Sequence, residues 1–424
     1  MGNRDYRSWF SCGILIATIT IAVSAYGQDD PDQIIPSTGD TFPAFASIDD
    51  HMIQFMKLHK VPGAALCIAK GGKVVYTRGF GYADIKQNRL VQPDSLFRIA
   101  DLSKPLTAAA VLQLAQRRRI NLKSNPFVIL GYVRQIRRPD ADPRLRDITI
   151  LHLLQHTAGW AVALSFDPLH EPERIAKAMK ISSPPSADAI VEFMLTQPLQ
   201  FEPGSRYADS NFGYFLLGRI IEKRSGQTYE QYVKKHVLEP LGVTSMRLAG
   251  SLPSERALEE VRYYDTKSES GPALQDSSSS VPTPYIVDMS VMGASEGWIA
   301  SAEDLVKFTA SLTNPKDDRI LNLGMLRRMY SPPDGPPGHN PNGKPKPWFY
   351  GCGWYVRPQR ELRFHNWHLA DMSGSSALLV HLSNDLSWAV LFNIDRSGTN
   401  GNVLDVLIDK TMYRAVAGVT IWPD

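Results

Sequence analysis

The order of strand-like and helical patterns along the chain most restricts what it can fold into. Two β-rich runs, residues 64–70 and 73–79, are joined by Gly71-Gly72, a two-residue turn that predicts a hairpin. Strand patterns return near the other end of the chain, at residues 352–356, 362–367, 377–382 and 386–393. Helical patterns fill the middle, at residues 106–116, 149–155, 214–223 and 229–237.

This order predicts a two-lobed fold of the α/β (α+β) class. An antiparallel sheet is built from both chain ends with flanking helices, and a helical lobe is inserted between them. The sheet lobe is expected at about residues 44–87 and 341–424, and the helical lobe at about residues 88–340. Residues 265–284 and 331–347 are too polar or too rich in proline to pack as core, so we expect irregular surface there.

The N-terminus has the pattern of a targeting segment. Two arginines precede an apolar run at residues 12–25, and a small–x–small pattern comes directly before Gln28. We therefore expect a cleaved signal peptide at residues 1–27, a linker at residues 28–43, and export to the periplasm or the medium. The apolar run is short for a membrane span, although an uncleaved N-terminal anchor is the alternative. No later stretch is long enough to cross a bilayer.

Composition excludes some classes of partner. The formal net charge is +3 and 21% of the residues are charged, so no strong field points to nucleic acid. The compact basic run, residues 117–119, ends a helical stretch, where cations suit the helix dipole, and we interpret it as a solvated helix end.

The cysteines give no sign of redox or metal chemistry. Cys12 falls in the predicted signal peptide, and Cys67 and Cys352 lie in apolar, strand-like segments. Export permits a disulfide between these two, but two cysteines in a large domain are more often buried apolar residues. Neither has the spacing of a metal ligand, and no cofactor is expected.

Three short segments carry residue types suited to catalysis. They are FRIADLSKPLTAAAVLQL (residues 97–114), ADSN (208–211) and HLADMSG (368–374). In the first segment the i, i+3 spacing puts Asp101 and Lys104 on one helix face. With the stretches ITILHLLQHTAG, FEPGSRYADSNFGY and SAEDLVKF, the set resembles the serine β-lactamase and penicillin-binding-protein family, especially its class C and esterase-like branch. The resemblance covers about Ala44 to Pro423.

The resemblance implies a specific role for the first segment. In that family an S-x-x-K motif supplies a serine that attacks an acyl carbon and a lysine, kept neutral by burial, that helps to remove the serine proton. Lys104 matches the lysine, but Asp101 stands where the serine is expected. Ser103 cannot replace it, because adjacent residues on a helix point about 100° apart.

The other two segments also depart from the family pattern. In the Y-x-N motif, Asn211 matches the asparagine that helps to hold the substrate amide, whereas Asp209 replaces the tyrosine that shares the proton transfer. In the H-x-G strand, His368 matches the first position, but Ala370 stands where glycine is expected. A side chain at this position crowds the approach of a substrate backbone along the strand.

Electrostatics predicts the effect of these replacements on Lys104. An ionised Asp101 at about 4 Å favours the ammonium form by roughly 4 kcal/mol at an effective dielectric constant of 20, and Asp209 adds to this. A lysine held protonated cannot act as a base. Loss of the nucleophilic serine alone lowers turnover on the order of 10⁶-fold in a serine protease. We therefore expect no ordinary acyl-serine catalysis.

Three interpretations of Asp101 remain open. It caps the start of its helix and forms an ion-pair network with Lys104 and Asp209; it acts as a carboxylate nucleophile; or it converges with Asp209 and His368 on a metal ion. Lys104 in the middle of the group argues against the metal.

Three histidines and one tyrosine have side chains suited to catalysis, but we assign them no catalytic role. His152, His156 and His365 are assigned no catalytic function, and His156 is expected to pack structurally at a helix end. Tyr207 lies two residues before Asp209, a spacing expected to face it elsewhere.

The function predicted from the sequence is an exported pseudoenzyme. Asp101, Lys104, Asp209 and His368 are the altered catalytic group. Asn211 and Ala370 line a substrate position in a cleft between the lobes, which binds a small-molecule or peptide-like ligand, such as an acyl-peptide or a cell-wall-like molecule. The alternative is an active hydrolase of esterase, peptidase or β-lactamase type that uses altered groups such as Asp101.

Overall fold

The computed structural model describes residues 34–266, 270–272, 280–314, 316–359, 363–420 and 422. The predicted signal peptide and most of the predicted linker therefore lie outside the described residues. Residues from Ile34 onward form one compact unit.

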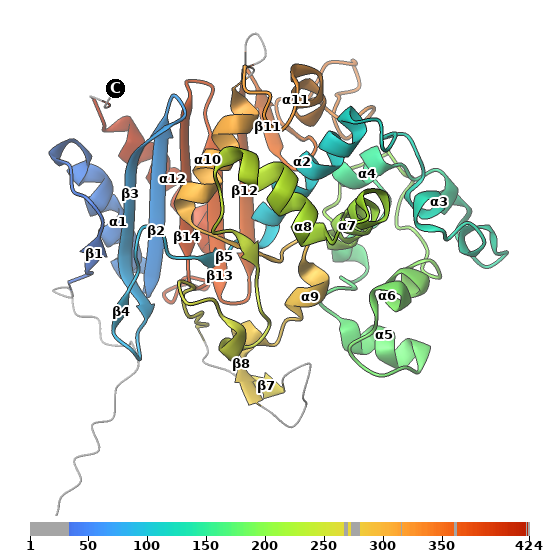
Figure 1. The fold of residues 1–424 in the computed structure, drawn as a ribbon, viewed down its shortest axis with the longest axis horizontal. Coiled ribbons are helices and arrows are strands. Elements are labelled where there is room, and N and C mark those ends of the chain that lie inside the picture. The colour runs from blue at the N-terminus through green and yellow to red at the C-terminus, as the bar shows by residue number, and fades with distance from the viewer. Residues whose placement is uncertain are drawn as a thin grey trace, which may run out of the picture. The chain divides into compact units, whose positions relative to one another are not determined.

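An antiparallel sheet joins the two ends of this unit. Strands β2 (Gly63–Lys70) and β3 (Lys73–Asp84) form the predicted hairpin, and β2 also pairs with β14 (Leu386–Phe392). In Figure 1 the blue strands therefore lie beside the red ones. Within the described residues the sheet has nine strands; the others are β1 (Ser37–Thr38), β4 (Arg89–Leu90), β10 (Phe349–Tyr350), β11 (Tyr355–Pro358), β12 (Phe364–Met372) and β13 (Ser375–His381).

Both faces of the sheet are buried, which explains why its central strands are apolar throughout. In β14, Trp388, Val390 and Phe392 pack in one core cluster, whereas Ala389 and Leu391 pack in the other, because side chains alternate along a strand. Helices α1 (Ala46–His59) and α12 (Leu404–Ala417) contribute to the first cluster. The second includes α10 (Ala302–Thr313), which packs on β2 and β14.

Helix α2 (Ser103–Gln116) is the centre of the helical part. Its sequence is apolar on every side, and every residue from Ser103 to Leu114 is buried, as expected for a helix enclosed by others. Helix α7 (Asn211–Ser225) packs along it. The remaining helices are α3 (Pro126–Leu130), α4 (Ile150–Leu154), α5 (Pro172–Met179), α6 (Ala187–Met194), α8 (Tyr229–Val233), α9 (Met289–Met292) and α11 (Leu323–Met329).

Two small sheets complete the fold. Strands β5 (Phe97–Arg98), β9 (Trp298–Ala300) and β6 (Arg247–Leu248) form one of them, and β5 comes shortly before α2 in the sequence. Strands β7 (Ser270–Pro272) and β8 (Ser280–Pro282) form the other.

The predicted fold class is confirmed: a mixed α/β structure with an antiparallel sheet from both chain ends and flanking helices. One local expectation is wrong, because the segment 265–284, expected to be irregular, contains the β7–β8 pair; its residues 267–269 and 273–279 lie outside the described residues. Helix α10 falls within the range 88–340 expected for the helical lobe, yet it packs on the sheet. None of the described helices has both the length and the apolar character needed to cross a membrane.

Gly353 lets the turn between β10 and β11 lie against α2. It has a φ of +81°, and a Cβ there would lie 2.8 Å from the Cβ of Ala108 and 3.1 Å from the Cα of Pro105. We predict that Gly353→Ala lowers the free energy of unfolding by at least about 2 kcal/mol, since it combines overpacking with a left-handed backbone. Urea unfolding monitored by fluorescence measures this.

The control for this prediction is Gly226→Ala. Gly226 also has a positive φ, +73°, but open space surrounds its Cβ position. Only the backbone penalty applies there, about 1 kcal/mol. Equal losses in the two variants would show that Gly353 does not set the packing distance to α2.

Candidate functional site

Asp101 lies in a strained turn directly before α2. The 3-10 turn Ala100–Leu102 carries it, and Lys104 is the second residue of the helix that follows. Ala100 is buried and has a φ of +41°, a conformation that costs a non-glycine residue about 1–3 kcal/mol. Strand β12 packs against this turn. The backbone that presents residue 101 is therefore held in place by its surroundings.

Lys104 lies between two carboxylates. Its Nζ is 2.5 Å from Oδ1 of Asp101 and 3.0 Å from Oδ1 of Asp209. The lysine side chain is buried, the Asp101 side chain is 17% exposed, and the Asp209 side chain is 52% exposed. The group thus meets solvent through Asp209.

The charges in this group favour an ammonium form of Lys104. Burial lowers the pKa of Lys104, but Asp101 and Asp209 outweigh burial and raise it well above its usual range. Burial raises the pKa of Asp209, but Lys104 and His156 outweigh it and hold this pKa well below the usual range. Burial raises the pKa of Asp101, with Lys104 acting in the opposite direction. Two carboxylates therefore share one buried cation.

Asp101 does not cap its helix, contrary to one of our expectations. No side-chain hydrogen bond caps the 3-10 turn or the start of α2. The ammonium of Lys104, one turn along on the same helix face, draws the carboxylate away from the backbone amides. Ser103 points away from the group, as expected, because its Oγ accepts a hydrogen bond from the Trp298 backbone N–H at 3.2 Å.

His156 belongs to this group although the sequence analysis gave it only a packing role. Its Nδ1 accepts the backbone N–H of Ser210 at 3.2 Å, so the proton is on Nε2, which lies 2.7 Å from Oδ1 of Asp209. The His156 backbone carbonyl also accepts the N–H of Ala208. Burial lowers the pKa of His156, so the ring is neutral at pH 7. His156 is thus the residue that fixes the loop carrying Asp209.

His368 faces the same side of the sheet but contacts neither carboxylate. Both ring nitrogens are engaged: Nδ1 donates to the Leu369 carbonyl at 2.7 Å, and Nε2 accepts from the Tyr350 hydroxyl at 3.0 Å. Burial lowers the pKa of His368 to about 3. His368 lies close enough to Lys104 and Asp209 for their charges to affect its pKa, but its ring nitrogens bond Leu369 and Tyr350 rather than a carboxylate. Among the described residues no cluster of His, Cys, Asp or Glu has the arrangement of a metal site.

Ala370 follows His368 by two residues on β12, so both side chains point to the same face. Ala370 is buried and lies opposite Ala377 of β13. A methyl group therefore occupies the strand position at which the family pattern has glycine.

A cluster of tyrosines, which sequence reasoning missed, borders the group. The Tyr350 ring lies 4.7 Å from the His156 ring and 5.5 Å from the Tyr207 ring, and the Tyr207 and Tyr355 hydroxyls are 2.9 Å apart. The expectation that Tyr207 faces elsewhere is therefore wrong. Its hydroxyl bonds Tyr355 and does not reach Lys104, so it does not take the place of the missing motif tyrosine.

Asn211 is the first residue of α7, and only one end of its side-chain amide has a hydrogen-bond partner among the described residues. Its Nδ2 donates to Oδ2 of Asp167 at 2.9 Å, whereas its buried Oδ1 has no hydrogen-bond partner among the described residues. A buried acceptor without a partner is unfavourable unless a ligand or water supplies a donor. The amide is thus able to accept one hydrogen bond.

Further carboxylates surround the group. Glu296 is buried and lies 2.7 Å from Nε2 of His170; burial lowers the pKa of His170, but this contact outweighs it and raises the pKa to about 9. Burial raises the pKa of Asp167, with Glu296 adding to it. Two basic groups, Lys104 and His170, thus lie among four carboxyl groups, which belong to Asp101, Asp209, Glu296 and Asp167.

The sequence matches the family described as Beta-lactamase over residues 48–412. The chain belongs to the β-lactamase family. The predicted resemblance is thereby confirmed, and the Asp101–Lys104 segment lies within the matched region of this β-lactamase family member.

One protein is similar to this chain in sequence, and two solved structures are similar to it in fold. Protein flp of Staphylococcus aureus (strain MW2) is 26% identical over 364 residues, which are 84% of this chain and 64% of that protein. The chain thus spans less than two thirds of the length of that relative. The structure of an octameric penicillin-binding protein homologue from Pyrococcus abyssi has a TM-score of 0.65 at 22% identity, covering 88% of this chain and 77% of the other. That of a D-stereospecific amidohydrolase from Streptomyces sp. has a TM-score of 0.64 at 22% identity, covering 86% and 98%.

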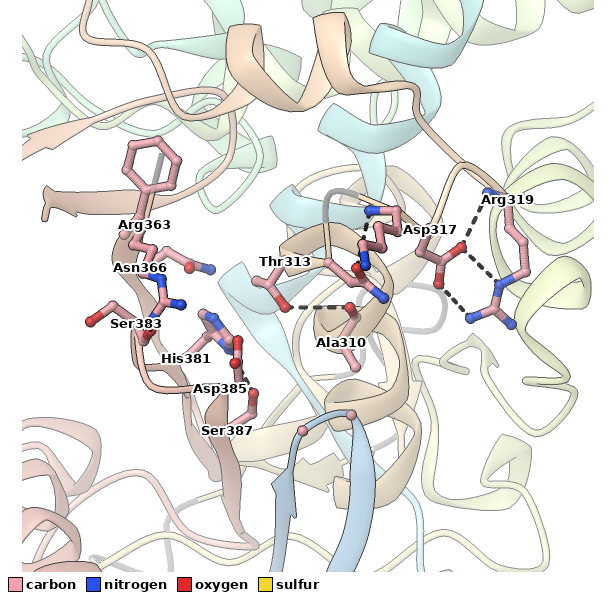
Figure 2. Close-up of a pocket in the computed structure, with 15 residues that line it drawn as sticks. Ala310, Thr313, Asp317, Arg319, Arg363, Asn366, His381, Ser383, Asp385 and Ser387 are labelled. Atoms are coloured by element: carbon pink, nitrogen blue, oxygen red, sulfur yellow. Dashed lines mark hydrogen bonds and ion pairs between the residues drawn. The ribbon is translucent and has the colours of Figure 1, made fainter. Parts of the chain in front are cut away.

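A separate cavity of about 740 Å³ shares no residue with the Lys104 group. The Gly71-Gly72 turn, the end of α10 and the adjoining strands line it. Figure 2 shows Asn366 and His381 on the strand side, with Ala310 and Thr313 across from them. Its charges have both signs, and Arg319 is already paired with Asp317 at 2.6 Å.

We predict that Lys104→Met lowers the free energy of unfolding by about 3–5 kcal/mol at pH 7, because it leaves two carboxylates without their buried cation. The pKa of Asp101, which burial already raises, then rises further, and the pKa of Asp209 rises because it loses the cation that lowers it. The loss is therefore present at neutral pH and shrinks as the pH falls towards 4. Adding Asp101→Asn to Lys104→Met should recover part of it. Urea unfolding at pH 4 to 8 tests these expectations.

The control is Lys307→Met. Lys307 forms an ion pair with Glu303 at 2.7 Å, but both side chains are substantially exposed. Such pairs contribute less than about 1 kcal/mol. If Lys104→Met were no more destabilising than this control, Lys104 would not be the charged centre of the group.

Proposed function

We propose that this chain is an exported, catalytically degenerate member of the β-lactamase family that binds acyl-peptide or cell-wall-like ligands at the Lys104 group. The observation that carries the proposal is the position of the Lys104 ammonium, 2.5 Å from Asp101 and 3.0 Å from Asp209. The residue expected to serve as base is surrounded by acceptors that keep it protonated.

Each component of acyl-serine chemistry is compromised. The nucleophile position holds a carboxylate engaged by Lys104, the nearby Ser103 hydroxyl bonds the backbone of β9, and no tyrosine hydroxyl replaces Asp209. A carboxylate paired with an ammonium is a poor nucleophile towards an amide, because its electron pairs are already stabilised.

The capacity to bind a peptide-like ligand is better supported. Asp209 is half exposed, and Asn211 retains a buried oxygen without a partner, an arrangement suited to accepting the N–H of a ligand amide. The half-exposed Asp209 carboxylate, whose pKa is held low, favours a ligand that also carries an amine. Two structurally similar proteins, a penicillin-binding protein homologue and a D-stereospecific amidohydrolase, make a peptide-like ligand the natural class to test.

Export is part of the proposal and rests on the N-terminal sequence. The apolar run at residues 12–25 and the small–x–small pattern before Gln28 support cleavage there. An exported protein would meet cell-wall fragments directly.

We predict that a fluorescent penicillin does not label the mature protein covalently, whereas muramyl dipeptide raises its melting temperature. Asp101→Ala should leave the absence of labelling unchanged, and Asn211→Leu should abolish the thermal shift because the leucine cannot accept a hydrogen bond. Gel fluorescence and thermal-shift assays measure the two effects. A stoichiometric penicillin adduct, or ester hydrolysis that disappears in Asp101→Ala, would replace this proposal with a working hydrolase.

We also predict that catalysis returns only when several residues change together. Asp101→Ser supplies a hydroxyl, but Asp209 still holds Lys104 charged, and Asp209→Tyr alone leaves no nucleophile. The triple variant Asp101→Ser/Asp209→Tyr/Ala370→Gly should hydrolyse a nitrophenyl ester above background, since residues that act as a unit have non-additive effects. Strong turnover from Asp101→Ser alone would show that Asp209 does not disable Lys104.

A further inference from the structure

A second hollow, of about 720 Å³, lies where the C-terminal ends of α2 and α7 meet the short helix α11. Helix α2 ends at Gln116 and α7 ends at Ser225. Helix α11 contributes Gly324 and Met325 from its first turn and Arg328 from its second, and α2 packs against both of the other helices. Five cations line this space, and of the described residues around it none is acidic. We call it the basic hollow; its cations are Arg118, Arg119, Lys123, Arg224 and Arg328.

These cations lack partners within the described residues. All five are exposed, and none of their side chains forms an ion pair or a hydrogen bond with another described residue. Other surface arginines differ: Arg138 pairs with Asp140 at 2.7 Å, and Arg144 pairs with Asp142 at 2.6 Å. The basic hollow is therefore a local excess of positive charge in a chain whose formal net charge is only +3.

Helix dipoles account for a small part of this charge. Cations stabilise the C-terminal end of a helix, which carries about −0.5 elementary charge. The two C-terminal ends, of α2 and α7, contribute at most about −1 charge, so the five cations exceed what the helices need. The sequence interpretation of residues 117–119 as a solvated helix end covers only this part, because Arg224 and Arg328 come from other helices.

The floor of the basic hollow is apolar. Ile120 and Ile129 are buried, and Leu122, Leu151 and Met325 are partly buried beside them. A cavity of this volume suits a small ligand rather than a long polymer. The ligand that fits carries a compact negative group for the rim and an apolar portion for the floor.

Arginines favour phosphate for the negative group. The guanidinium fork matches phosphate oxygens in bidentate geometry, and phosphate carries up to two charges on one centre. We propose that the basic hollow binds a phosphate group attached to an apolar portion. A soluble organic phosphate and the headgroup of an anionic phospholipid share this chemistry.

This site is separate from the Lys104 group. Lys104 lies near the start of α2 and Arg118 just beyond its end, about 20 Å apart at 1.5 Å per residue. The proposal therefore does not depend on the function assigned to Asp101.

The test uses the mature protein with two probes. 1-Naphthyl phosphate represents a soluble phosphate, with neutral 1-naphthol as its control, and phosphatidylglycerol vesicles represent a lipid, with phosphatidylcholine vesicles as theirs. Binding is measured by isothermal titration for the soluble probe and by co-sedimentation for vesicles, at 50 and 300 mM salt.

The hollow variant is Arg118→Gln/Arg119→Gln/Arg328→Gln. Its matched control, Arg134→Gln/Arg137→Gln/Arg146→Gln, removes the same charge from exposed arginines that do not line the hollow. We expect at least one phosphate probe to bind, at least tenfold weaker binding in the hollow variant, and no more than a twofold change in the control. Circular dichroism confirms that both variants fold.

Comparing the soluble probe with the vesicles also identifies whether the phosphate belongs to a soluble molecule or to a lipid. Binding of naphthyl phosphate without vesicle association points to a soluble phosphate, and vesicle association points to a lipid headgroup. The proposal is overturned if neither phosphate probe binds, if naphthol binds as well as its phosphate, or if both variants lose affinity equally. A loss of stability in the hollow variant with unchanged probe affinity would likewise leave the cations with a purely structural role.

Discussion

A single buried ammonium organises the functional centre of this protein. Lys104 is enclosed on α2, and it is charged because Asp101 and Asp209 approach it from the turn before the helix and from the loop before α7. The buried ammonium requires a carboxylate partner, and the largely buried Asp101 carboxylate is less unfavourable beside a cation. The loop at residue 209, the ring of His156 and the tyrosine cluster all take their positions around this arrangement, so the site is held by electrostatics across three segments distant in sequence.

The fold could be predicted from the sequence because local patterns specify it. The Gly71-Gly72 turn and the apolar runs at each end define the strands, and the apolar character of residues 106–114 defines a helix that must be enclosed. The predicted ends of the strands are less accurate than their positions. Strand β12 runs on through the HLADMSG segment to Met372, because its pairing with β13, rather than its own composition, decides where it ends.

The site could be predicted only where its geometry is local. Asp101 and Lys104 meet because they are three residues apart on one helix, which the sequence states directly. His156 contacts Asp209, which lies 53 residues later in the chain, and Tyr350 contacts His368 across the sheet. The spacing of these residues in the sequence does not indicate that they meet. The rotation of Asp101 away from a capping position likewise depends on a competition between an ammonium and backbone amides, which only three-dimensional proximity decides.

The pairing of β2 with β14 has a consequence for how the chain reaches its native state. Ala65 of β2 lies opposite Leu391 of β14. The free edge of the N-terminal hairpin therefore has no pairing strand until β14 is synthesised, more than 300 residues later. The central pairing of the sheet, and the face that receives α10, cannot be completed until the chain has been synthesised as far as β14. Contacts this distant make folding slow and keep an extended chain unfolded during synthesis. Such a delay suits the export that we propose, because translocation machinery that threads extended polypeptides would then meet no finished domain.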